Sequence, residues 1–98
     1  MRKIFLCGAH YCTPCKFIRT HMLKEIEEAC PGQTEYVDLQ KTTGAINRFQ
    51  VYQIPMMCVM DGDEIVARYS GAYPSKECLI DWLRGERNDL DSELFEPH

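Results

Sequence analysis

The chain has 98 residues, of which 45% are hydrophobic, and a formal net charge of −4. This length suits one domain with a single small core. Residues 1–84 carry ten basic and ten acidic side chains, so the whole acidic excess lies in residues 85–98. Because no basic patch is present, we expect neither nucleic acid nor an anionic membrane surface as a partner.

The cysteines and the N-terminal segment indicate a reducing compartment. No stretch approaches the roughly 18–20 apolar residues that span a bilayer. The apolar run after Lys3 is shorter than the roughly 7–15 residues of a signal-peptide core. Six cysteines could form three bridges in a secreted miniprotein, but Cys7, Cys58 and Cys78 lie in apolar segments, where reduced cysteine packs as a small hydrophobe. We therefore expect a cytoplasmic protein, with Cys30 exposed near a helix end.

The first half of the chain predicts a strand, a helix and a second strand. Residues 4–7 form a continuous apolar run, which is typical of a strand buried on both faces. Residues 15–29 have helical spacing, and Pro31-Gly32 ends the pattern. Residues 35–39 alternate polar and apolar side chains, as a strand does. The helical spacing rests on Phe17, Ile18, Met22, Leu23, Ile26 and Ala29.

The second half predicts a short helix, a hairpin and a last helix. Thr42 or Thr43 can cap a helix that runs through Ile46 and Phe49. Residues 56–60 and 64–69 are strands joined by a turn at residues 61–63. Ser75 is a candidate cap for the last helix, whose core side would carry Leu79, Trp82 and Leu83.

The predicted order β-α-β-α-β-β-α gives an α/β fold with a four-stranded mixed sheet flanked by helices. The first βαβ unit should be parallel, and the last two strands antiparallel. We expect one domain over residues 1–84. Residues 85–98 would be either an acidic, frayed tail or a short extra helix with Leu90, Leu94 and Phe95 on one face.

Cys12 and Cys15 lie between the first strand and the first helix. Open α/β sheets place their sites in such loops, at the carboxyl ends of parallel strands. At a helix start, free N–H groups and the helix dipole stabilise a thiolate, which is the nucleophilic form of cysteine. Two intervening residues let both sulfur atoms approach bonding distance, and Pro14 fits the first turn because it needs no N–H partner there. The pair is therefore a candidate for thiol–disulfide exchange, with Cys12 attacking and Cys15 resolving.

Two other classes of function remain open for this pair. Cys12 and Cys15 with Cys7 or His10 could bind zinc or an iron–sulfur cluster, although a second ligand pair at useful spacing is absent. A redox-inactive interaction module with the same fold is the third interpretation.

Pro55 and His10 each have two interpretations. Pro55 lies just before an apolar strand, and a cis bond after Ile54 would form a tight turn in front of the cysteines; an ordinary trans turn is the alternative. His10 is either a proton donor to the cysteine pair or an exposed loop residue.

The segment Tyr11-Cys12-Thr13-Pro14-Cys15-Lys16 resembles the aromatic-CGPCK active site of the thioredoxin superfamily. Tyr11 stands for the usual Trp and Thr13 for the usual Gly. Residues 54–71 are similar to the family's cis-proline strand, hairpin and final strand. The resemblance covers about residues 3–84 and is closer to thioredoxin than to glutaredoxin. It implies a minimal thioredoxin fold that lacks the first strand and helix of full thioredoxins.

The resemblance also implies an activity. The chain would be a protein disulfide oxidoreductase that acts mainly as a reductant and electron donor in cell redox homeostasis. It would be a monomer with no bound cofactor and no metal, and its electrons would come from a thioredoxin-reductase-like flavoprotein or from glutathione. A glutathione-dependent or iron–sulfur or zinc-binding glutaredoxin-like module is the alternative. Pro55 would be cis, and the substrate-binding residues would be Tyr11, Thr13, Pro14, Ile54, Pro55, Gly71 and Ala72, with Met56 on the same apolar rim.

Several positions depart from the family pattern. Leu6 stands where thioredoxins carry a buried acid, and Tyr36 aligns with the lysine near that acid. Proton transfer at Cys15 therefore lacks its usual helper, so water, His10 or Tyr11 would have to contribute. The long helix lacks the family's kink proline and has Thr20 nearby.

Overall fold

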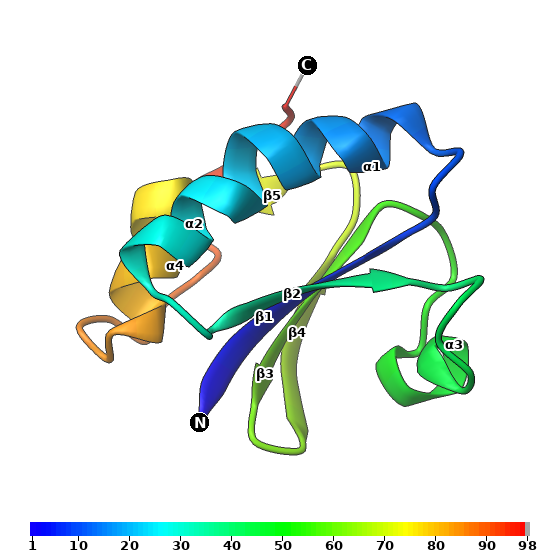
Figure 1. Cartoon of the computed structure of the whole chain (residues 1–98). Coiled ribbons are helices and arrows are strands. Elements are labelled where there is room, and N and C mark those ends of the chain that lie inside the picture. Colours follow the sequence, from blue (N-terminus) through cyan, green and yellow to red (C-terminus); the bar gives the residue numbers. More distant parts are fainter. Residues whose placement is uncertain (98) are drawn as a thin grey trace.

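The computed structural model describes residues 1–97 and contains one four-stranded sheet with helices on both sides (Figure 1). The strand order is β2-β1-β3-β4, which confirms the expected mixed sheet. In chain order the elements are β1 (Arg2–Gly8), α1 (Thr13–Ile18), the π-helical segment η1 (Arg19–Leu23), α2 (Lys24–Ala29), β2 (Thr34–Asp38), α3 (Ala45–Phe49), β3 (Met56–Asp61), β4 (Glu64–Tyr69), β5 (Tyr73–Pro74), α4 (Lys76–Leu83) and β6 (Leu94–Phe95).

The pairing of β1 places the functional loop at one end of the sheet. β1 runs parallel to β2, with Leu6 opposite Tyr36 and Gly8 opposite Asp38. β1 runs antiparallel to β3, and β3 to β4. The chain therefore leaves the centre of the sheet at Gly8 and enters the loop that leads to Cys12.

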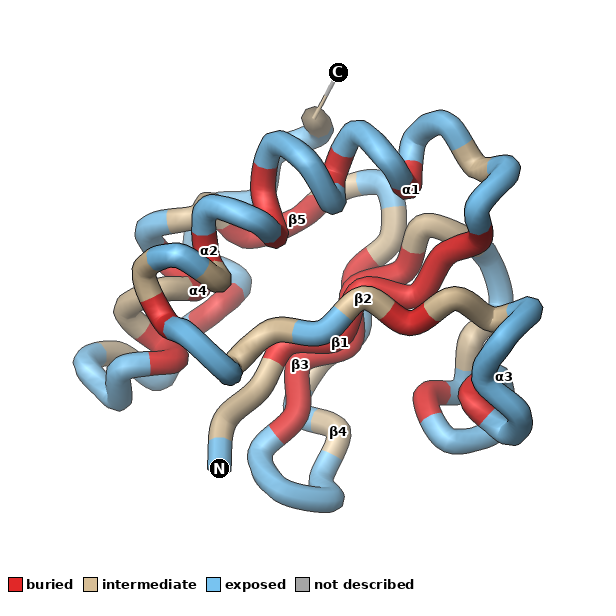
Figure 2. Tube along the Cα trace, viewed as in Figure 1, coloured by how far each residue is buried: buried red, intermediate tan, exposed pale blue. Residues whose placement is uncertain are grey.

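The two faces of the sheet have separate apolar cores. The helical layer of α1, η1, α2 and α4 covers one face, and α3 covers the other (Figure 1). Because side chains alternate along a strand, Ile4 and Leu6 of β1 pack toward the helical layer, whereas Phe5 and Cys7 pack toward α3. β1 and β3 are consequently buried along most of their length (Figure 2).

The predicted long helix is one helical stretch with a π-helical middle. α1, η1 and α2 follow each other without a break, and Thr20 lies in η1. Met22 and Leu23 are adjacent in the sequence, yet both are only 4% exposed. The wider π turn allows both side chains to face the sheet. Phe17, which the helical spacing assigned to the core side, is 37% exposed.

Two local expectations were wrong, the N-cap of α3 and the exposure of Cys30. The N-cap of α3 is Gly44, with a φ of 82° and no side-chain cap, rather than Thr42 or Thr43. Ile46 is 54% exposed, because in a helix of five residues only Ala45 and Phe49, one turn apart, face the sheet. Cys30 is buried rather than exposed, because the chain turns back after α2 and the residue joins the core under the helical layer.

The segment after α4 is neither a helix nor a frayed tail in its described part. Leu90 is 4% exposed and belongs to the core under the helical layer. β6 pairs with β5, with Tyr73 opposite Phe95, and the hydroxyl of Tyr69 donates a hydrogen bond to the Asp91 carboxylate. The segment therefore packs back onto the domain. No helix within residues 1–97 has the length and hydropathy to cross a membrane.

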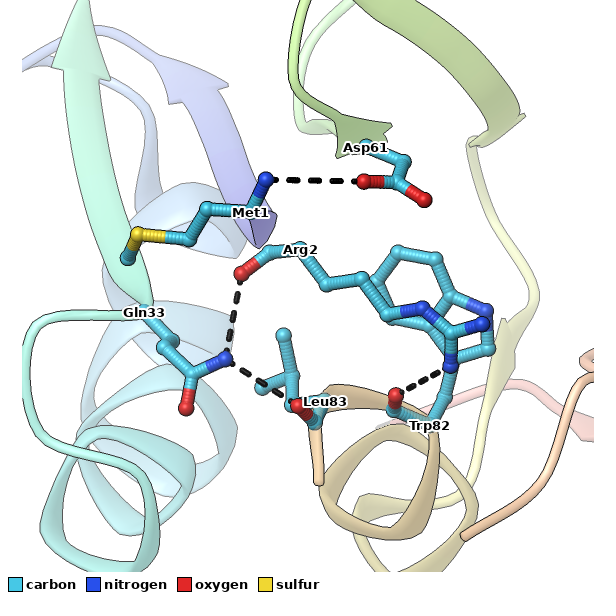
Figure 3. A network of polar contacts seen from close by, with 6 residues as sticks. All are labelled: Met1, Arg2, Gln33, Asp61, Trp82 and Leu83. Carbon is cyan, nitrogen blue, oxygen red and sulfur yellow. Dashed lines mark hydrogen bonds and ion pairs between the residues drawn. The ribbon is translucent and has the colours of Figure 1, made fainter. Parts of the chain in front are cut away.

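Polar contacts fix the amino end of β1 to α4 and to the β3–β4 turn (Figure 3). The Arg2 guanidinium donates to the Trp82 carbonyl at 2.7 Å and lies over the Trp82 ring. The Gln33 side chain donates to the carbonyls of Arg2 and Leu83, each at 3.1 Å. The N-terminal amine lies 3.6 Å from the Asp61 carboxylate. These contacts hold the end of β1 that is remote from Cys12.

Candidate functional site

Cys12 and Cys15 form a disulfide across the first turn of α1. Their Cα atoms are 5.2 Å apart. Cys12 is the N-cap residue with extended backbone geometry, and its sulfur accepts a hydrogen bond from the Cys15 N–H at 3.3 Å. Pro14 lies in the first turn, where its missing N–H costs no helical hydrogen bond. The sequence Cys-Thr-Pro-Cys thus starts the helix and holds one sulfur at its N-terminus.

The two sulfur-bearing residues differ in exposure. Cys12 is half-buried, whereas Cys15 is 0% exposed. Cys15 lies against the end of β1, because its Sγ would be only 2.8 Å from a Cβ atom at Gly8. Cys12 is therefore the more accessible residue of the pair, and Cys15 is enclosed.

The charges around the disulfide lie at the surface. No Asp, Glu, Lys, Arg, His, Asn, Gln, Ser or Thr side chain within residues 1–97 is buried. The His10 imidazole lies 3.9 Å from the Asp38 carboxylate, and His10 is largely exposed. Lys16 is exposed. A thiolate on Cys12 would be stabilised mainly by the N–H groups of the helix start, since the macrodipole favours an anion there.

The peptide bond between Ile54 and Pro55 is cis. The Pro55 carbonyl accepts hydrogen bonds from the Ser70 hydroxyl at 3.0 Å and from the Tyr73 hydroxyl at 3.3 Å. The Tyr73 hydroxyl also accepts from the Gly71 N–H at 3.3 Å. Tyr73 is 1% exposed, and burial raises the pKa of its hydroxyl. Tyr73 thus joins the Pro55 loop to the loop after β4.

Some of the predicted binding residues come together beside the disulfide. Pro14, Pro55 and Gly71 line one hollow with Tyr73, and Thr13 lines an adjoining hollow with Pro14. Tyr11, Ile54 and Ala72 line neither of these two hollows. Tyr11 is 65% exposed and packs edge-on against His10. Met56 was assigned to the same rim, but its side chain is 0% exposed and belongs to the interior.

Sequence reasoning missed several residues of these hollows, among them Ser70, Tyr73 and Pro97. Ser70 and Tyr73 bind the Pro55 carbonyl, and Pro97 lines both hollows. The only available sequence signal for Tyr73 was that it is an aromatic residue directly before a proline, Pro74. Nothing local in the sequence indicates that Pro97 returns to α1, because that contact depends on the pairing of β6 with β5.

The other cysteines lie inside the domain. Burial, with a contribution from Cys58, raises the pKa of Cys7 to about 12. Burial raises the pKa of Cys58 to about 11, and it also raises that of Cys78. Thiols with such pKa values are poor nucleophiles near neutral pH. Within residues 1–97, no group of three or more His, Cys, Asp or Glu side chains is arranged to bind a metal ion.

Comparisons with known proteins identify the family. The thioredoxin family model matches residues 3–85. Among solved structures, a mutant thioredoxin from Halobacterium salinarum superposes with a TM-score of 0.69 at 15% identity, covering 87% of this chain and 74% of that one. Thioredoxin-2 of a malaria parasite gives 0.68 at 18% identity, with coverages of 87% and 82%. Thioredoxin 1 from Thermosipho africanus gives 0.66 at 17% identity, with coverages of 85% and 92%.

A search of curated protein sequences gave no match. The solved structures support the fold, and the family model covers most of the chain. Together with the Cys12–Cys15 pair, these findings support thiol–disulfide exchange as the general class of chemistry. The chain belongs to the thioredoxin family.

Proposed function

We propose that this protein is a protein disulfide reductase whose Cys12–Cys15 pair cycles between dithiol and disulfide. The observation that carries the proposal is the disulfide at the start of α1, with Cys12 half-buried and Cys15 fully buried. In the reduced protein, the Cys12 thiolate attacks a substrate disulfide and forms a mixed disulfide. Cys15 then attacks the Cys12 sulfur, which releases the substrate as a dithiol and restores the internal disulfide.

The hollow beside the disulfide is the proposed place for the substrate segment. It is lined by Pro14, Pro55, Gly71 and Tyr73. An extended segment laid over it could pair its backbone with that of Ile54, in the manner of an added strand. Tyr11, Thr13 and Ala72 complete the proposed binding set around Cys12. The exposed Tyr11 ring would supply apolar contact at the rim.

The electron source distinguishes the two versions of this function. Turnover of a protein disulfide should be measured twice, once with NADPH and a thioredoxin reductase and once with glutathione and its reductase. Activity in the first assay supports a thioredoxin-like donor, and activity in the second supports the glutaredoxin-like alternative. Absence of activity in both, with Cys12 unreactive to alkylation near neutral pH, would refute the proposed reductase.

The roles of the two cysteines can be separated by trapping. The Cys15→Ser variant should accumulate mixed disulfides on Cys12, because the resolving thiol is missing. The Cys12→Ser variant is the matched control and should trap nothing. If trapping requires Cys15 and persists in Cys12→Ser, the assignment of roles is reversed.

We further propose that the protein acts as a cytoplasmic monomer without a bound cofactor or metal. The buried cysteines outside the pair suit a reducing compartment, where thiols persist. Metal analysis of protein purified without chelator, together with sedimentation, tests both points. Stoichiometric zinc or iron, or a cluster-bridged dimer, would contradict the proposal.

A further inference from the structure

The Tyr36 hydroxyl and the Cys15 sulfur both lie close to Gly8, which has no side chain. The residue is buried at the end of β1. A Cβ atom at this position would lie 2.6 Å from the Tyr36 hydroxyl oxygen and 2.8 Å from the Cys15 Sγ. The hydroxyl and the sulfur are therefore no farther apart than the sum of these two distances. Because Gly8 has no side chain, it places no atom between the hydroxyl and the buried sulfur.

Tyr36 is held in this position by its neighbours. It pairs with Leu6 in the sheet, and its hydroxyl donates a long hydrogen bond of 3.4 Å to the Ala9 carbonyl. The Arg19 guanidinium lies 4.2 Å from the centre of its ring. Tyr36 is half-buried and lines an open hollow that also includes Lys16. The ring thus lies between the interior around Cys15 and solvent.

The resolving step needs a thiolate on Cys15 in a place that disfavours charge. Cys15 is 0% exposed, and Leu6, which pairs with Tyr36 in the sheet, is also 0% exposed and carries no polar group. Burial without a partner disfavours an anion, whereas a hydrogen bond to the charged form favours it. A donor close to the sulfur would therefore increase the thiolate fraction and speed the release of substrate.

We propose that the Tyr36 hydroxyl donates a hydrogen bond to the Cys15 thiolate and thereby promotes the resolving step. This inference rests on the proposed disulfide reductase and names a residue that acts within it. On reduction, the hydroxyl exchanges its long bond to the Ala9 carbonyl for one to the sulfur. Tyr36 keeps its proton throughout, and it stabilises the charge that develops on the sulfur.

The step balances without any further reactant. The Cys15 thiol loses its proton to water, and the resulting thiolate attacks the Cys12 sulfur of the mixed disulfide. The bond between Cys12 and the substrate sulfur breaks as the Cys12–Cys15 bond forms. The substrate leaves as a thiolate and takes up a proton from water, so that the substrate disulfide is reduced and the two cysteines are oxidised.

The charged surroundings of Tyr36 favour a donor that stays protonated. Burial raises the pKa of the Tyr36 hydroxyl, Arg19 opposes this effect, and Asp38 and Cys7 add to it. His10 approaches Asp38 from the loop after β1, and Lys16 approaches from α1. Because these groups remain the same in wild type and variant, a comparison at each pH isolates the effect of the hydroxyl.

The test is a titration of Cys15 in a Cys12→Ser background, followed by ultraviolet absorbance of the thiolate. The Tyr36→Phe substitution should raise the pKa of Cys15 by about one unit. In the two-cysteine protein, the same substitution should slow resolution of a Cys12–thionitrobenzoate mixed disulfide about tenfold near neutral pH, and less at high pH. The first attack by Cys12 should keep its rate.

Matched variants complete the experiment. Tyr52→Phe makes the same chemical change at a side chain that is 69% exposed, and it should alter neither quantity. Gly8→Ala places a methyl group between the hydroxyl and the sulfur, and it should shift the Cys15 titration in the same direction as Tyr36→Phe. An unchanged Cys15 titration in Tyr36→Phe, or a loss of rate that is equal at every pH, would overturn the inference. The titration uses no protein substrate, so its outcome is separate from that of the reductase assay.

Discussion

Two pairs of cysteines lie on different sides of the sheet and have opposite chemical environments. Cys7 and Cys58 are each 0% exposed and face α3, and burial raises the pKa of both thiols. Cys12 and Cys15 lie just beyond the end of β1, on the helical side, where a helix begins at Cys12. Because the side chains are chemically identical, we expect position in the fold to decide their reactivity. A strand interior keeps a thiol protonated, whereas a helix start favours the thiolate.

The largest expected difference between the pairs is in turnover. Cys12→Ser removes the attacking sulfur and should lower disulfide reduction on the order of 10³-fold or more, because no covalent path remains. Cys58→Ala, the matched removal of a buried sulfur, should retain turnover per folded molecule. Both are measured with the same coupled assay after far-ultraviolet circular dichroism has established folding. Equal losses of turnover in the two variants would show that the two pairs of cysteines do not differ in function.

The second difference is in alkylation of the reduced native protein near neutral pH. With a pKa of about 12 rather than the ordinary 9.0, Cys7 has a thiolate fraction lower by about 10³-fold. Iodoacetamide should therefore modify Cys12 first, and it should reach Cys7 and Cys58 only after unfolding in guanidinium. Mass spectrometry of timed samples gives the order. Early modification of Cys7 would show that the strand end opens in the native state.

Alkaline pH should lower the stability of the fold by deprotonating the buried thiols of Cys7 and Cys58. Their pKa values are raised in the folded protein, so the native state binds more protons than the unfolded state between about pH 9 and pH 12. Their stabilising contribution is fully present below about pH 9 and is lost as pH rises through the folded pKa values. The free energy of unfolding should fall by about 1 kcal/mol per pH unit for each thiol.

Urea unfolding of the oxidised protein at several pH values measures this slope, because the Cys12–Cys15 disulfide does not titrate. Cys58→Ala should reduce the slope between pH 9 and pH 11 relative to wild type. A slope that Cys58→Ala leaves unchanged would mean that the tyrosine hydroxyls, rather than the buried thiols, dominate the alkaline loss of stability.

The smallest expected effect is a loss of folding stability on substitution of Gly8, which lies between Cys7 and Cys12 in the sequence. Gly8→Ala puts a Cβ atom within 3 Å of Tyr36 and Cys15, and overpacking of this kind typically costs about 1–3 kcal/mol. Urea unfolding of wild type and variant under oxidising conditions measures the loss. Ala9→Gly, at the next buried position, is a control that removes a methyl group instead of adding one. A neutral Gly8→Ala would indicate that the strand end yields easily.

Most of the sheet and the disulfide were predictable because they depend on local patterns. Apolar runs and the alternation of polar and apolar side chains predicted β1, β2, β3 and β4. The spacing of Cys12 and Cys15 before a helical pattern predicted the site. The confirmed cap at Ser75, whose hydroxyl accepts from the Cys78 N–H, followed from the same local logic. In each case the signal lies within a few residues of the feature that it predicts.

The errors concern contacts between distant segments. Cys30 comes directly after α2 and before Pro31-Gly32, and only the packing of α2 against α4 and the sheet determines that it is buried. The pairing of β6 with β5 is likewise a contact between remote residues, and a two-residue strand carries no periodic signal. The N-cap of α3 is a local exception: Gly44, whose positive φ is readily adopted by glycine, directly precedes the helix, and Thr42 and Thr43 lie before it. The role of Tyr73 at Pro55 depends on the same kind of remote contact.

The two ends of the described chain lie at different distances from the disulfide, and this difference matters for the design of fusion proteins. The N-terminal amine lies against Asp61, at the end of the sheet remote from the disulfide, whereas Pro97 lines a hollow with Thr13 and Pro14, next to the disulfide. A fluorescent protein or purification tag joined ahead of Met1 would leave the cysteine face open to large substrates. The same tag joined behind Pro97 would emerge next to the hollow that we propose for the substrate, and it would act as a steric filter. Fusion position is thus a means of selecting substrates by size.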